Sequence, residues 1–353
     1  MTDLLNSLLL QIKQTGPITV ADYMNICLLH PKHGYYSKQD PFGKKGDFIT
    51  SPEISQVFGE LLGLCLAQNW IDQGMEPFSL VEAGPGRGTL MADILRATKS
   101  VPDFHKNMSI HLIEESPALK KIQRETLSNF CVQWHKSFDH LPKKQIYFIA
   151  NEFFDALPIR QFKKTKTGWS EILVSQQENK LIFCLGNKIP LTAIPHRIKD
   201  TNLGDIIEIC AAAKPIMKFL SGQIMNYGGC AIIIDYGANH LKGNTLQSVK
   251  NHNKINTLKL PGNSDLTAHV DFTELTKDLS NILVTKTTRQ GTLLKRLGII
   301  NRMEKLTSNL KENQKIDYKA AAQRLIEPNE MGALFKAIAL YPSKLTAPAG
   351  FDL

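Results

Sequence analysis

The clearest chemical signal in this 353-residue sequence is a glycine-rich loop between a predicted strand and a predicted helix. The segment reads Glu82-Ala83-Gly84-Pro85-Gly86-Arg87-Gly88-Thr89. Glycines let the backbone pass close to a ligand, and the start of the following helix offers unpaired N–H groups to an anion. The segment lacks the Gly-Lys-Ser/Thr ending of a phosphate-binding P-loop, and it matches the dinucleotide-binding fingerprint only in part. The residues therefore indicate either another class of ligand-binding loop or an ordinary tight turn.

A second signal is an acid at the end of the next predicted strand. Glu114 is the first residue past the apolar run at 110–113. Its carboxylate could accept two hydrogen bonds from a ribose diol, each worth about 1.5–3 kcal/mol. Alternatively, Glu114 and Glu115 only cap the helix that follows. Trp134, at the end of a third predicted strand, could line an adenine pocket or belong to the core.

The glycine loop, with the acid two positions before its first glycine, resembles motif I of the class I S-adenosylmethionine methyltransferases. In that setting the loop backbone carries the amino-acid end of the cofactor, and Glu82 hydrogen-bonds its ammonium group. The cofactor-binding residues that we expect are Glu82, Gly84, Pro85, Gly86, Gly88, Thr89, Glu114 and Trp134.

More acids follow the fourth predicted strand, in the segment Asn151-Glu152-Phe153-Phe154-Asp155-Ala156-Leu157-Pro158. The carboxyl ends of parallel strands border the ligand crevice of a doubly wound sheet, so Asn151, Glu152 and Asp155 are our candidate catalytic residues. Two carboxylates suit a cationic acceptor, because they could pair with a guanidinium and orient one of its nitrogens. The prolines of the Asn/Asp-Pro-Pro-Tyr motif of amide-nitrogen and base methyltransferases are missing. A capped turn with buried phenylalanines is the alternative.

Strands and helices alternate in the middle of the chain and would position these residues. Strands are predicted at 78–83, 110–113, 132–134, 146–150 and 231–234, and helices at 53–72, 89–97, 118–127 and 211–227. This alternation predicts an α/β fold with a parallel, doubly wound sheet covered on both faces.

The flanking segments follow other patterns. We expect two short helices within residues 3–25, a loop over 30–52, an inserted hairpin over 162–185, and C-terminal helices at 293–310 and 318–325. The expected organisation is an N-terminal helical lid region (1–75), the first part of the core (76–160), an insertion with a β-hairpin and a helix (161–228), and the completion of the core sheet with a helical C-terminal region (229–353).

Composition limits the class of protein. The six cysteines never form a close pair, which fits reduced thiols and argues against a zinc ribbon. No histidine, cysteine and aspartate cluster has the spacing of metal ligands, so we predict no metal.

No apolar run approaches the roughly 20 residues of a membrane span. Asp3 and Asn6 interrupt the first apolar stretch, which is not typical of a signal peptide. The net charge of +9 permits nucleic acid binding, but no basic stripe interleaved with aromatics supports it. We expect a soluble intracellular protein.

Nearly the whole sequence resembles the MidA-type (DUF185) family. The matching motifs are His33-Gly34-Tyr35-Tyr36, Gly46-Asp47-Phe48-Ile49-Thr50-Ser51-Pro52-Glu53-Ile54-Ser55, Phe58-Gly59-Glu60, the glycine loop, Glu114 with Ser116-Pro117-Ala118-Leu119, the 151–158 segment, Ile234-Asp235-Tyr236-Gly237, the 265–272 segment, Gln290-Gly291, and Met331-Gly332-Ala333-Leu334-Phe335-Lys336. Mitochondrial members of this family are arginine methyltransferases that assist assembly of respiratory complex I.

The resemblance implies a class I methyltransferase (Rossmann-like) fold and S-adenosyl-L-methionine as cofactor. It also implies a protein arginine as acceptor, which we expect on a complex I subunit. The N-terminal lid would bring Tyr36, Glu53 and Gln56 to the substrate pocket, and Asp235 would shape the acceptor side. Lys136 replaces an acid that we would expect near the adenine. The location would be the cytoplasm of a bacterium, or the mitochondrial matrix if the protein is organellar. The oligomeric state cannot be read from the sequence.

Two other functions remain open at this point. One is a non-catalytic assembly chaperone with a vestigial cofactor pocket, for which the insertion and the helical tail would be partner-binding surfaces. The other is an RNA or small-molecule methyltransferase, for which nucleic acid binding would have to depend steeply on salt.

Overall fold

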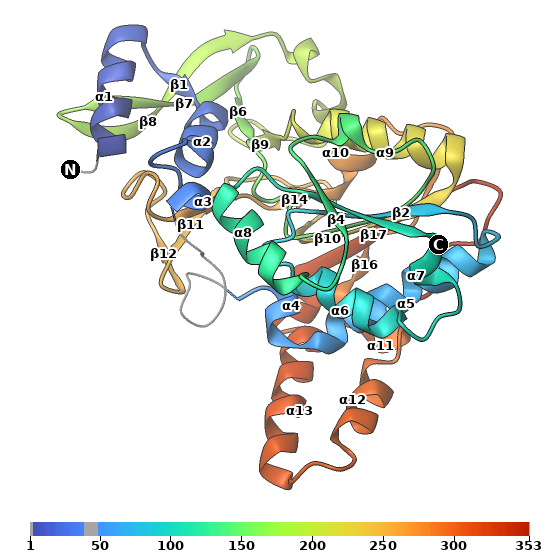
Figure 1. The fold of residues 1–353 in the computed structure, drawn as a ribbon. Coiled ribbons are helices and arrows are strands. Elements are labelled where there is room, and N and C mark those ends of the chain that lie inside the picture. Colours follow the sequence, from blue (N-terminus) through green and yellow to red (C-terminus); the bar gives the residue numbers. More distant parts are fainter. Residues whose placement is uncertain (1–2, 39–48, 353) are drawn as a thin grey trace. The chain divides into compact units, whose positions relative to one another are not determined.

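The computed structural model describes residues 3–38 and 49–352, and the chain forms two compact units (Figure 1). Unit 1 comprises Met1–Phe48, Asp155–Lys214 and Asn239–Leu275, and unit 2 comprises Ile49–Phe154, Pro215–Ala238 and Thr276–Leu353. Residues 46–48 of the family motif and 39–48 of the predicted loop lie outside the described residues. Each unit is assembled from three separate stretches of sequence and has its own apolar core.

The centre of unit 2 is a mostly parallel sheet, as the sequence predicts. Its strands follow the order β15-β17-β10-β5-β2-β3-β4, and β16 also pairs with β17. The strands are β2 (Phe78–Ala83), β3 (Met108–Ile113), β4 (Val132–His135), β5 (Gln145–Asn151), β10 (Gly229–Ala238), β15 (Leu283–Val284), β16 (Thr288–Arg289) and β17 (Phe335–Tyr341). Strands β4, β3, β2, β5 and β10 run parallel, whereas β17 is antiparallel to β10. The carboxyl ends of β2, β3 and β5 therefore meet at one edge.

Helices cover both faces of this sheet (Figure 1). The helices of unit 2 are α4 (Ser51–Ile54), α5 (Gln56–Asp72), α6 (Thr89–Thr98), α7 (Phe104–Asn107), α8 (Pro117–Thr126), α9 (Ala213–Tyr227), α11 (Gln290–Arg296), α12 (Ile299–Thr307), α13 (Glu312–Ile326) and α14 (Met331–Leu334), with a 3₁₀ turn at Phe138–His140. Helices α12 and α13 project away from the sheet as a pair. Helices α5 and α6 lie on one face and α9 on the other. The doubly wound arrangement expected from the alternation of strands and helices is confirmed.

Two predicted helices are each divided in the structure. The helix expected over 53–72 becomes α4 and α5, because Ser55 adopts an extended backbone (φ −155°) and its hydroxyl accepts a hydrogen bond from the N–H of Val57 at 3.3 Å. Such a side-chain cap begins a new helix. The helix expected over 293–310 is broken at Gly298, whose φ of +89° lies in the left-handed region. Both breaks are local backbone features that apolar periodicity does not show.

Aromatic packing joins α5 to the sheet. The Trp70 ring of α5 contacts Phe78 of β2, with centroids 5.6 Å apart, and lies edge-on to Phe104 of α7 at 5.2 Å. Phe78 in turn lies edge-on to Tyr147 of β5 at 5.1 Å. All four side chains are fully buried. Edge-to-face pairs of this kind contribute about 0.5–1.5 kcal/mol beyond the burial of their area, so this cluster helps to fix β2, which leads into the glycine loop.

Unit 1 contains two small antiparallel sheets. Its strands are β1 (Ile18–Thr19), β6 (Arg160–Lys164), β7 (Trp169–Gln177), β8 (Lys180–Ile189) and β9 (Ile206–Ile209) in one sheet, and β11 (Gln247–Lys250), β12 (Asn253–Ile255) and β13 (Asp265–Thr267) in the other. The unit also holds α1 (Asp3–Thr15), α2 (Val20–Leu29), α3 (Tyr35–Lys38), α10 (Phe272–Thr276), β14 (Val270–Asp271) and two 3₁₀ turns at Leu191–Ala193 and Pro195–Arg197.

The predicted hairpin is present but belongs to a larger sheet. Strands β7 and β8 are joined at Glu178 and Asn179, which both have positive φ, as the tightest hairpin turns require. Strand β7 also pairs with β6 and with β1 from the N-terminal segment. Such long-range pairing explains why the sequence showed a hairpin and not a five-stranded sheet. None of the helices in the described part of the chain is long and apolar enough to cross a membrane.

A buried histidine pair in the sheet predicts a pH dependence of stability. His111 in β3 is fully buried, and its ring nitrogens lie 2.8 Å from the Ser109 hydroxyl and 3.0 Å from His135 Nε2. Burial, together with His135 and Lys144, lowers the pKa of His111 to about 4. Unfolding therefore takes up a proton below pH 6.5, and stability is lost as the pH falls toward 4. We expect the titration of His111 to lower the free energy of unfolding by about 2 kcal/mol as the pH falls from 7 to 5.

Urea unfolding at both pH values checks this prediction by comparing the native chain with His111→Gln. The variant should lose less stability on acidification than the native chain does. The exposed His252, changed to Gln, is the matched control and should behave as the native chain. The same pH dependence in all three proteins would contradict the prediction.

Candidate active site

The glycine loop joins β2 to α6 through three left-handed glycines. Gly84, Gly86 and Gly88 have φ of +62°, +53° and +83°, and the N–H of Gly88 donates to the carbonyl of Pro85 at 2.7 Å. A Cβ on Gly84 would lie 2.9 Å from Phe153 Cδ2, so no larger residue fits there without a shift. The loop is thus a compact turn at the carboxyl end of β2 that requires glycine, and it leads directly into the helix N-terminus that an anion could use.

Glu82 places a buried carboxylate in the strand just before this loop. Its side chain is only 2% exposed, and its Oε2 atom has no hydrogen-bond partner within the described residues. Burial raises the pKa of Glu82 to about 8, although a hydrogen bond from the Met91 backbone opposes the shift. A buried carboxylate with an unsatisfied oxygen is costly unless a ligand completes it. The site therefore suits a ligand that brings a positively charged hydrogen-bond donor.

Glu114 and Trp134 lie on the neighbouring strands and share one partner. Glu114 follows β3, and its Oε1 atom accepts from the N–H of Ser116 at 2.8 Å. Its Oε2 atom accepts from the side chain of Gln123 at 3.1 Å, and Gln123 accepts from the indole N–H of Trp134 at 2.9 Å. The two predicted residues are thus connected through Gln123, which the sequence analysis did not single out.

Glu53 is brought to the glycine loop within unit 2. Its Oε1 atom accepts from the Thr89 hydroxyl at 2.5 Å, and its Oε2 atom lies 3.6 Å from the guanidinium of Arg87. Glu53 thus spans the last residues of the loop from α4. Gln56 is the first residue of α5 and is half-buried. The substrate-binding roles expected for both stay predictions.

Glu152 follows β5 in an unusual backbone conformation. Its φ is +54°, which non-glycine residues adopt at a cost of about 1–3 kcal/mol and which is common at functional sites. Its Oε1 atom accepts from the N–H of Ser51 at 3.2 Å and from the amide of Asn151 at 3.0 Å. The Oδ1 atom of Asn151 is buried with no partner among the described residues. The structure brings these two candidates together, in a strained turn at the end of the strand beside β2.

Asp235 has a different environment from the one expected of a substrate contact. It is fully buried in β10, where its Oδ2 atom accepts from the N–H of Phe154 at 3.0 Å and its Oδ1 atom from the N–H of Tyr236 at 2.9 Å. These bonds fix the turn that carries Glu152. Asp235 therefore supports the shape of the turn, and a contact with substrate stays a prediction.

Asp155 and Tyr36 belong to unit 1, where they lie with Asp265; the two acids are buried and Tyr36 is half-buried. The Tyr36 hydroxyl donates to Asp265 Oδ1 at 3.0 Å, and the backbone carbonyl of Asp155 accepts from the N–H of Ala268 at 2.9 Å. Burial and the charges of Asp265 and Asp155 raise the pKa of Tyr36. No sequence signal singles out Asp265 within the 265–272 segment, because its polar-apolar context does not distinguish it from a turn residue.

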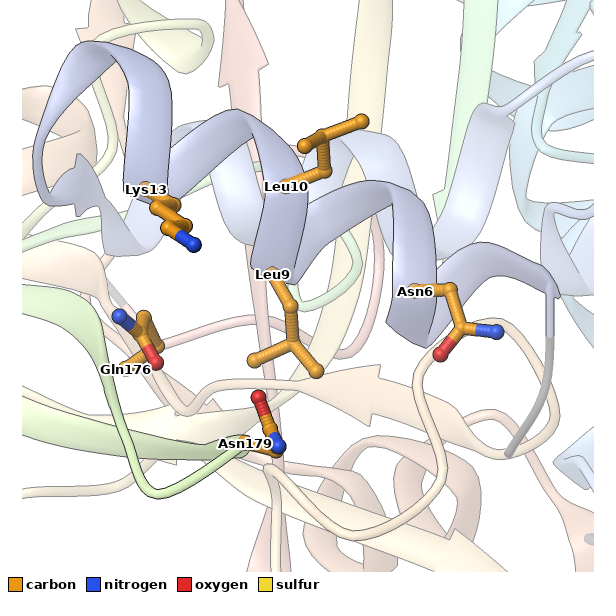
Figure 2. Close-up of a pocket in the computed structure, with 6 residues that line it drawn as sticks. All are labelled: Asn6, Leu9, Leu10, Lys13, Gln176 and Asn179. Carbon is orange, nitrogen blue, oxygen red and sulfur yellow. The ribbon is translucent and has the colours of Figure 1, made fainter.

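Unit 1 also has a shallow cavity that contains none of the predicted site residues. It lies between α1 and the β7–β8 turn and has a volume of about 330 Å³ (Figure 2). It is lined by Asn6, Leu9, Leu10, Lys13, Gln176 and Asn179. Among the residues that the structure describes, no group of histidine, cysteine or acidic side chains could hold a metal ion.

Comparison with known proteins connects this geometry to one family. Residues 61–288 match the Methyltransf_28 family, described as an S-adenosyl-L-methionine-dependent methyltransferase. The chain is 39% identical to the mouse and 37% identical to the human protein arginine methyltransferase NDUFAF7, mitochondrial. The alignments cover 97% of this chain and 85% and 84% of those proteins. The Drosophila melanogaster homolog is 35% identical over 96% of this chain and 84% of its own length.

A solved structure agrees with this comparison. A protein from Burkholderia thailandensis crystallised with S-adenosyl-homocysteine matches with a TM-score of 0.84 and 27% identity, covering 98% of this chain and 93% of that one. A native structure from the same organism matches with a TM-score of 0.82 over the same shares of both chains.

Proposed function

The chain belongs to the Methyltransf_28 family of S-adenosyl-L-methionine-dependent methyltransferases, and from this premise we propose that its methyl acceptor is an arginine side chain of a protein. The observation that carries the proposal is the extent of the likeness, since relatives named protein arginine methyltransferases align with 97% of the chain. The resemblance further supports an acceptor on a subunit of respiratory complex I. We propose the mitochondrial matrix as its location if the protein is organellar, and the cytoplasm if it is bacterial.

The residues of unit 2 fit the cofactor. The unsatisfied Glu82 oxygen would take the ammonium group, and the left-handed loop from Gly84 to Gly88 would carry the amino-acid end. Glu114 would accept from the ribose diol, and Trp134 would lie against the adenine. Bound S-adenosyl-L-methionine supplies a sulfonium whose methyl group is electrophilic.

Glu152 is the residue that we assign to the acceptor. Its carboxylate would pair with the guanidinium and hold one nitrogen in line for transfer, because the strained turn, Ser51 and Asn151 fix its orientation. Positioning of this kind can lower a barrier by about 7–11 kcal/mol. The same carboxylate would accept the proton that the substituted nitrogen loses, which is worth a further factor of about 10²–10⁴. Asp155 remains a second candidate for the acceptor side.

Mass spectrometry of complex I subunits tests the acceptor. Subunits from cells with and without this gene product are compared, and one methylarginine should be lost without it. Cells that carry Glu152→Gln should also lose the mark, whereas cells that carry Glu115→Gln, a change of an exposed acid near the cofactor residues, should keep it. Unchanged arginine methylation in all cells would contradict the arginine proposal, and full assembly with Glu152→Gln would favour a non-catalytic role.

The raised pKa of Glu82 is expected to have opposite effects on ligand affinity and on the stability of the fold as the pH rises. Because burial raises the pKa of Glu82 to about 8, unfolding releases a proton at neutral pH, and stability falls as the pH rises from 4.5 toward 8. Between pH 5 and pH 8 the free energy of unfolding should therefore fall by about 3 kcal/mol less in Glu82→Gln than in the native chain. The ammonium of the ligand favours the ionised carboxylate, so the affinity of the native chain for S-adenosylhomocysteine should rise several-fold from pH 6.5 to pH 8.

Calorimetric titration and urea unfolding at these pH values measure both effects. Glu82→Gln should bind S-adenosylhomocysteine about 10–100-fold more weakly at pH 8, with little dependence on pH. Asp93→Asn is the matched control for the titration, because Asp93 is another buried acid of unit 2 with an unsatisfied oxygen but has no role assigned in the site, so its affinity should be native. Native affinity and native pH dependence in Glu82→Gln would exclude Glu82 as the ammonium partner.

A further inference from the structure

A fully buried amide lies between the three parts of the proposed cofactor site. Gln123 is in α8, one helical turn after Leu119, and these two residues form the buried side of that helix. Every other side chain of α8 is exposed or only half-buried. A polar residue on the buried face of a short helix is unusual, and its buried groups require partners.

The partners of Gln123 come from three different elements. Its Nε2 atom donates to the carbonyl of Gly86 at 2.8 Å and to Glu114 Oε2 at 3.1 Å. Its Oε1 atom accepts from the indole N–H of Trp134 at 2.9 Å. The side chain thus connects the glycine loop, the acid after β3 and the aromatic residue of β4, all within unit 2.

The chemistry of the partners allows one orientation of the amide. An indole N–H can only donate, so it must face the amide oxygen, and a backbone carbonyl can only accept, so it must face the NH₂ group. The second hydrogen of that NH₂ group then points to Glu114 and requires an acceptor. Glu114 Oε1 meanwhile accepts from the N–H of Ser116, and the backbone N–H of Glu115 also donates to the carboxylate. A carboxylate has about four acceptor sites, so Glu114 can still accept from a further donor.

These contacts act on the state of Glu114 and on the position of Trp134. Burial raises the pKa of Glu114, and the hydrogen bonds from Ser116, Gln123 and the Glu115 backbone oppose that shift, so they favour the ionised form. The next residue of α8, Arg124, places its guanidinium carbon 5.1 Å from the centre of the Trp134 ring. Gln123 therefore contacts the N–H edge of the Trp134 indole, and the adjacent Arg124 lies over the face of the same ring.

We propose that Gln123 is a positioning residue that sets selectivity for the ribose of the cofactor, by holding Glu114 as a hydrogen-bond acceptor for the diol while it fixes the Gly86 carbonyl and Trp134. This inference rests on the proposed assignment of Glu114 to the ribose. Without the amide, Glu114 would lose the donor to Oε2 and keep the backbone donors of the turn that follows it, so the ribose contact would weaken more than the other cofactor contacts.

The test compares two ligands in calorimetric titrations, S-adenosylhomocysteine and its 2′-deoxy analogue. The native chain should prefer the parent ligand at least tenfold, because the analogue leaves one lone pair of the half-buried Glu114 carboxylate without a donor. Gln123→Met keeps the length and the apolar stem, and its preference should fall below threefold. Gln133→Met makes the same change at an exposed residue beside Trp134 in β4, and its preference should be native.

Further variants keep the test decisive. Gln123→Glu replaces the NH₂ group by an oxygen that faces two acceptors, so it should lose at least as much preference as Gln123→Met. If Gln123→Met does not fold, Gln123→Asn replaces it, because the shorter side chain cannot reach all three partners. In Glu114→Gln, where the acceptor has already changed, adding Gln123→Met should alter the preference less than it does alone.

The outcomes separate this inference from the proposed function. No preference in the native chain would remove the assignment of Glu114 to the ribose. A native preference that survives unchanged in the folded Gln123 variants would overturn the role of Gln123 and leave that assignment intact. Equal weakening of both ligands with the preference retained would also overturn it, because Gln123 would then be only a structural residue.

Discussion

Glu152→Gln is expected to lower kcat for methyl transfer about 100–1,000-fold while the dissociation constant for S-adenosylhomocysteine changes less than about threefold. The substitution keeps the size of the side chain and an oxygen that can accept from Ser51 and Asn151. It removes the negative charge that would pair with the guanidinium and accept its proton. Single-turnover kinetics with a complex I preparation from cells that lack the gene product, together with calorimetric titration of the cofactor product, measure the two quantities separately.

The backbone at this position provides a second, independent readout. The left-handed φ of +54° at Glu152 is a strained conformation that glycine would adopt without cost. Glu152→Gly should therefore abolish transfer without lowering the free energy of unfolding by more than the loss of the contacts that its side chain makes. Glu115→Gln, an exposed acid, is the control for both quantities. Retention of full activity by Glu152→Gln would remove Glu152 from the mechanism.

Gly86→Val is expected to weaken binding of S-adenosylhomocysteine more than 100-fold. Gly86 has a φ of +53°, and a β-branched residue avoids that region, so the loop would have to change its path. Its carbonyl also accepts from Gln123 at 2.8 Å, and a shift of the loop would disturb this bond. Calorimetric titration of the native and variant proteins checks the loss.

The control for this variant is another left-handed glycine of the same unit. Gly298 has a φ of +89° with open space around it and begins α12. Gly298→Val should carry a comparable backbone strain and still bind the ligand as the native chain does. If Gly86→Val and Gly298→Val both bind with native affinity, the loop is an ordinary turn rather than a cofactor site.

The elements that the sequence predicted well are those whose signals are local. The strand over residues 78–83 is a short apolar run that ends at glycines, and β2 has the same bounds. The hairpin turn at Glu178 and Asn179 and the strand before Asn151 have similar local signals. The positions of Glu82, Glu114 and Glu152 at strand ends followed from these elements, because residues at the carboxyl ends of parallel strands share one edge.

The elements that the sequence missed depend on contacts between distant residues. Strand β17 has the sequence Phe-Lys-Ala-Ile-Ala-Leu-Tyr, whose alanines and lysine weaken the pattern of a strand. It forms through antiparallel pairing with β10, about a hundred residues earlier in the chain. Strand β1 is two residues long and exists through its pairing with β7. Such pairings cannot be found by reading periodicity along one segment.

Gln123 shows the same limit at the level of the site. A glutamine within a helix of low hydropathy is usually exposed, and its three partners lie 37, 9 and 11 residues away. One local signal could have been used, since Gln123 follows Leu119 at the four-residue spacing of a buried helix face. The division of the candidate acids between the units, with Glu152 in unit 2 and Asp155 in unit 1, was also beyond reach, because the two are only three residues apart.

A crystal structure of this chain with S-adenosylhomocysteine bound tests the assignment of the cofactor site most directly. We predict the ligand's ammonium within hydrogen-bonding distance of the Glu82 carboxylate, and its ribose hydroxyls within that distance of Glu114. A ligand bound elsewhere, or bound here with both carboxylates turned to other partners, would contradict the assignment.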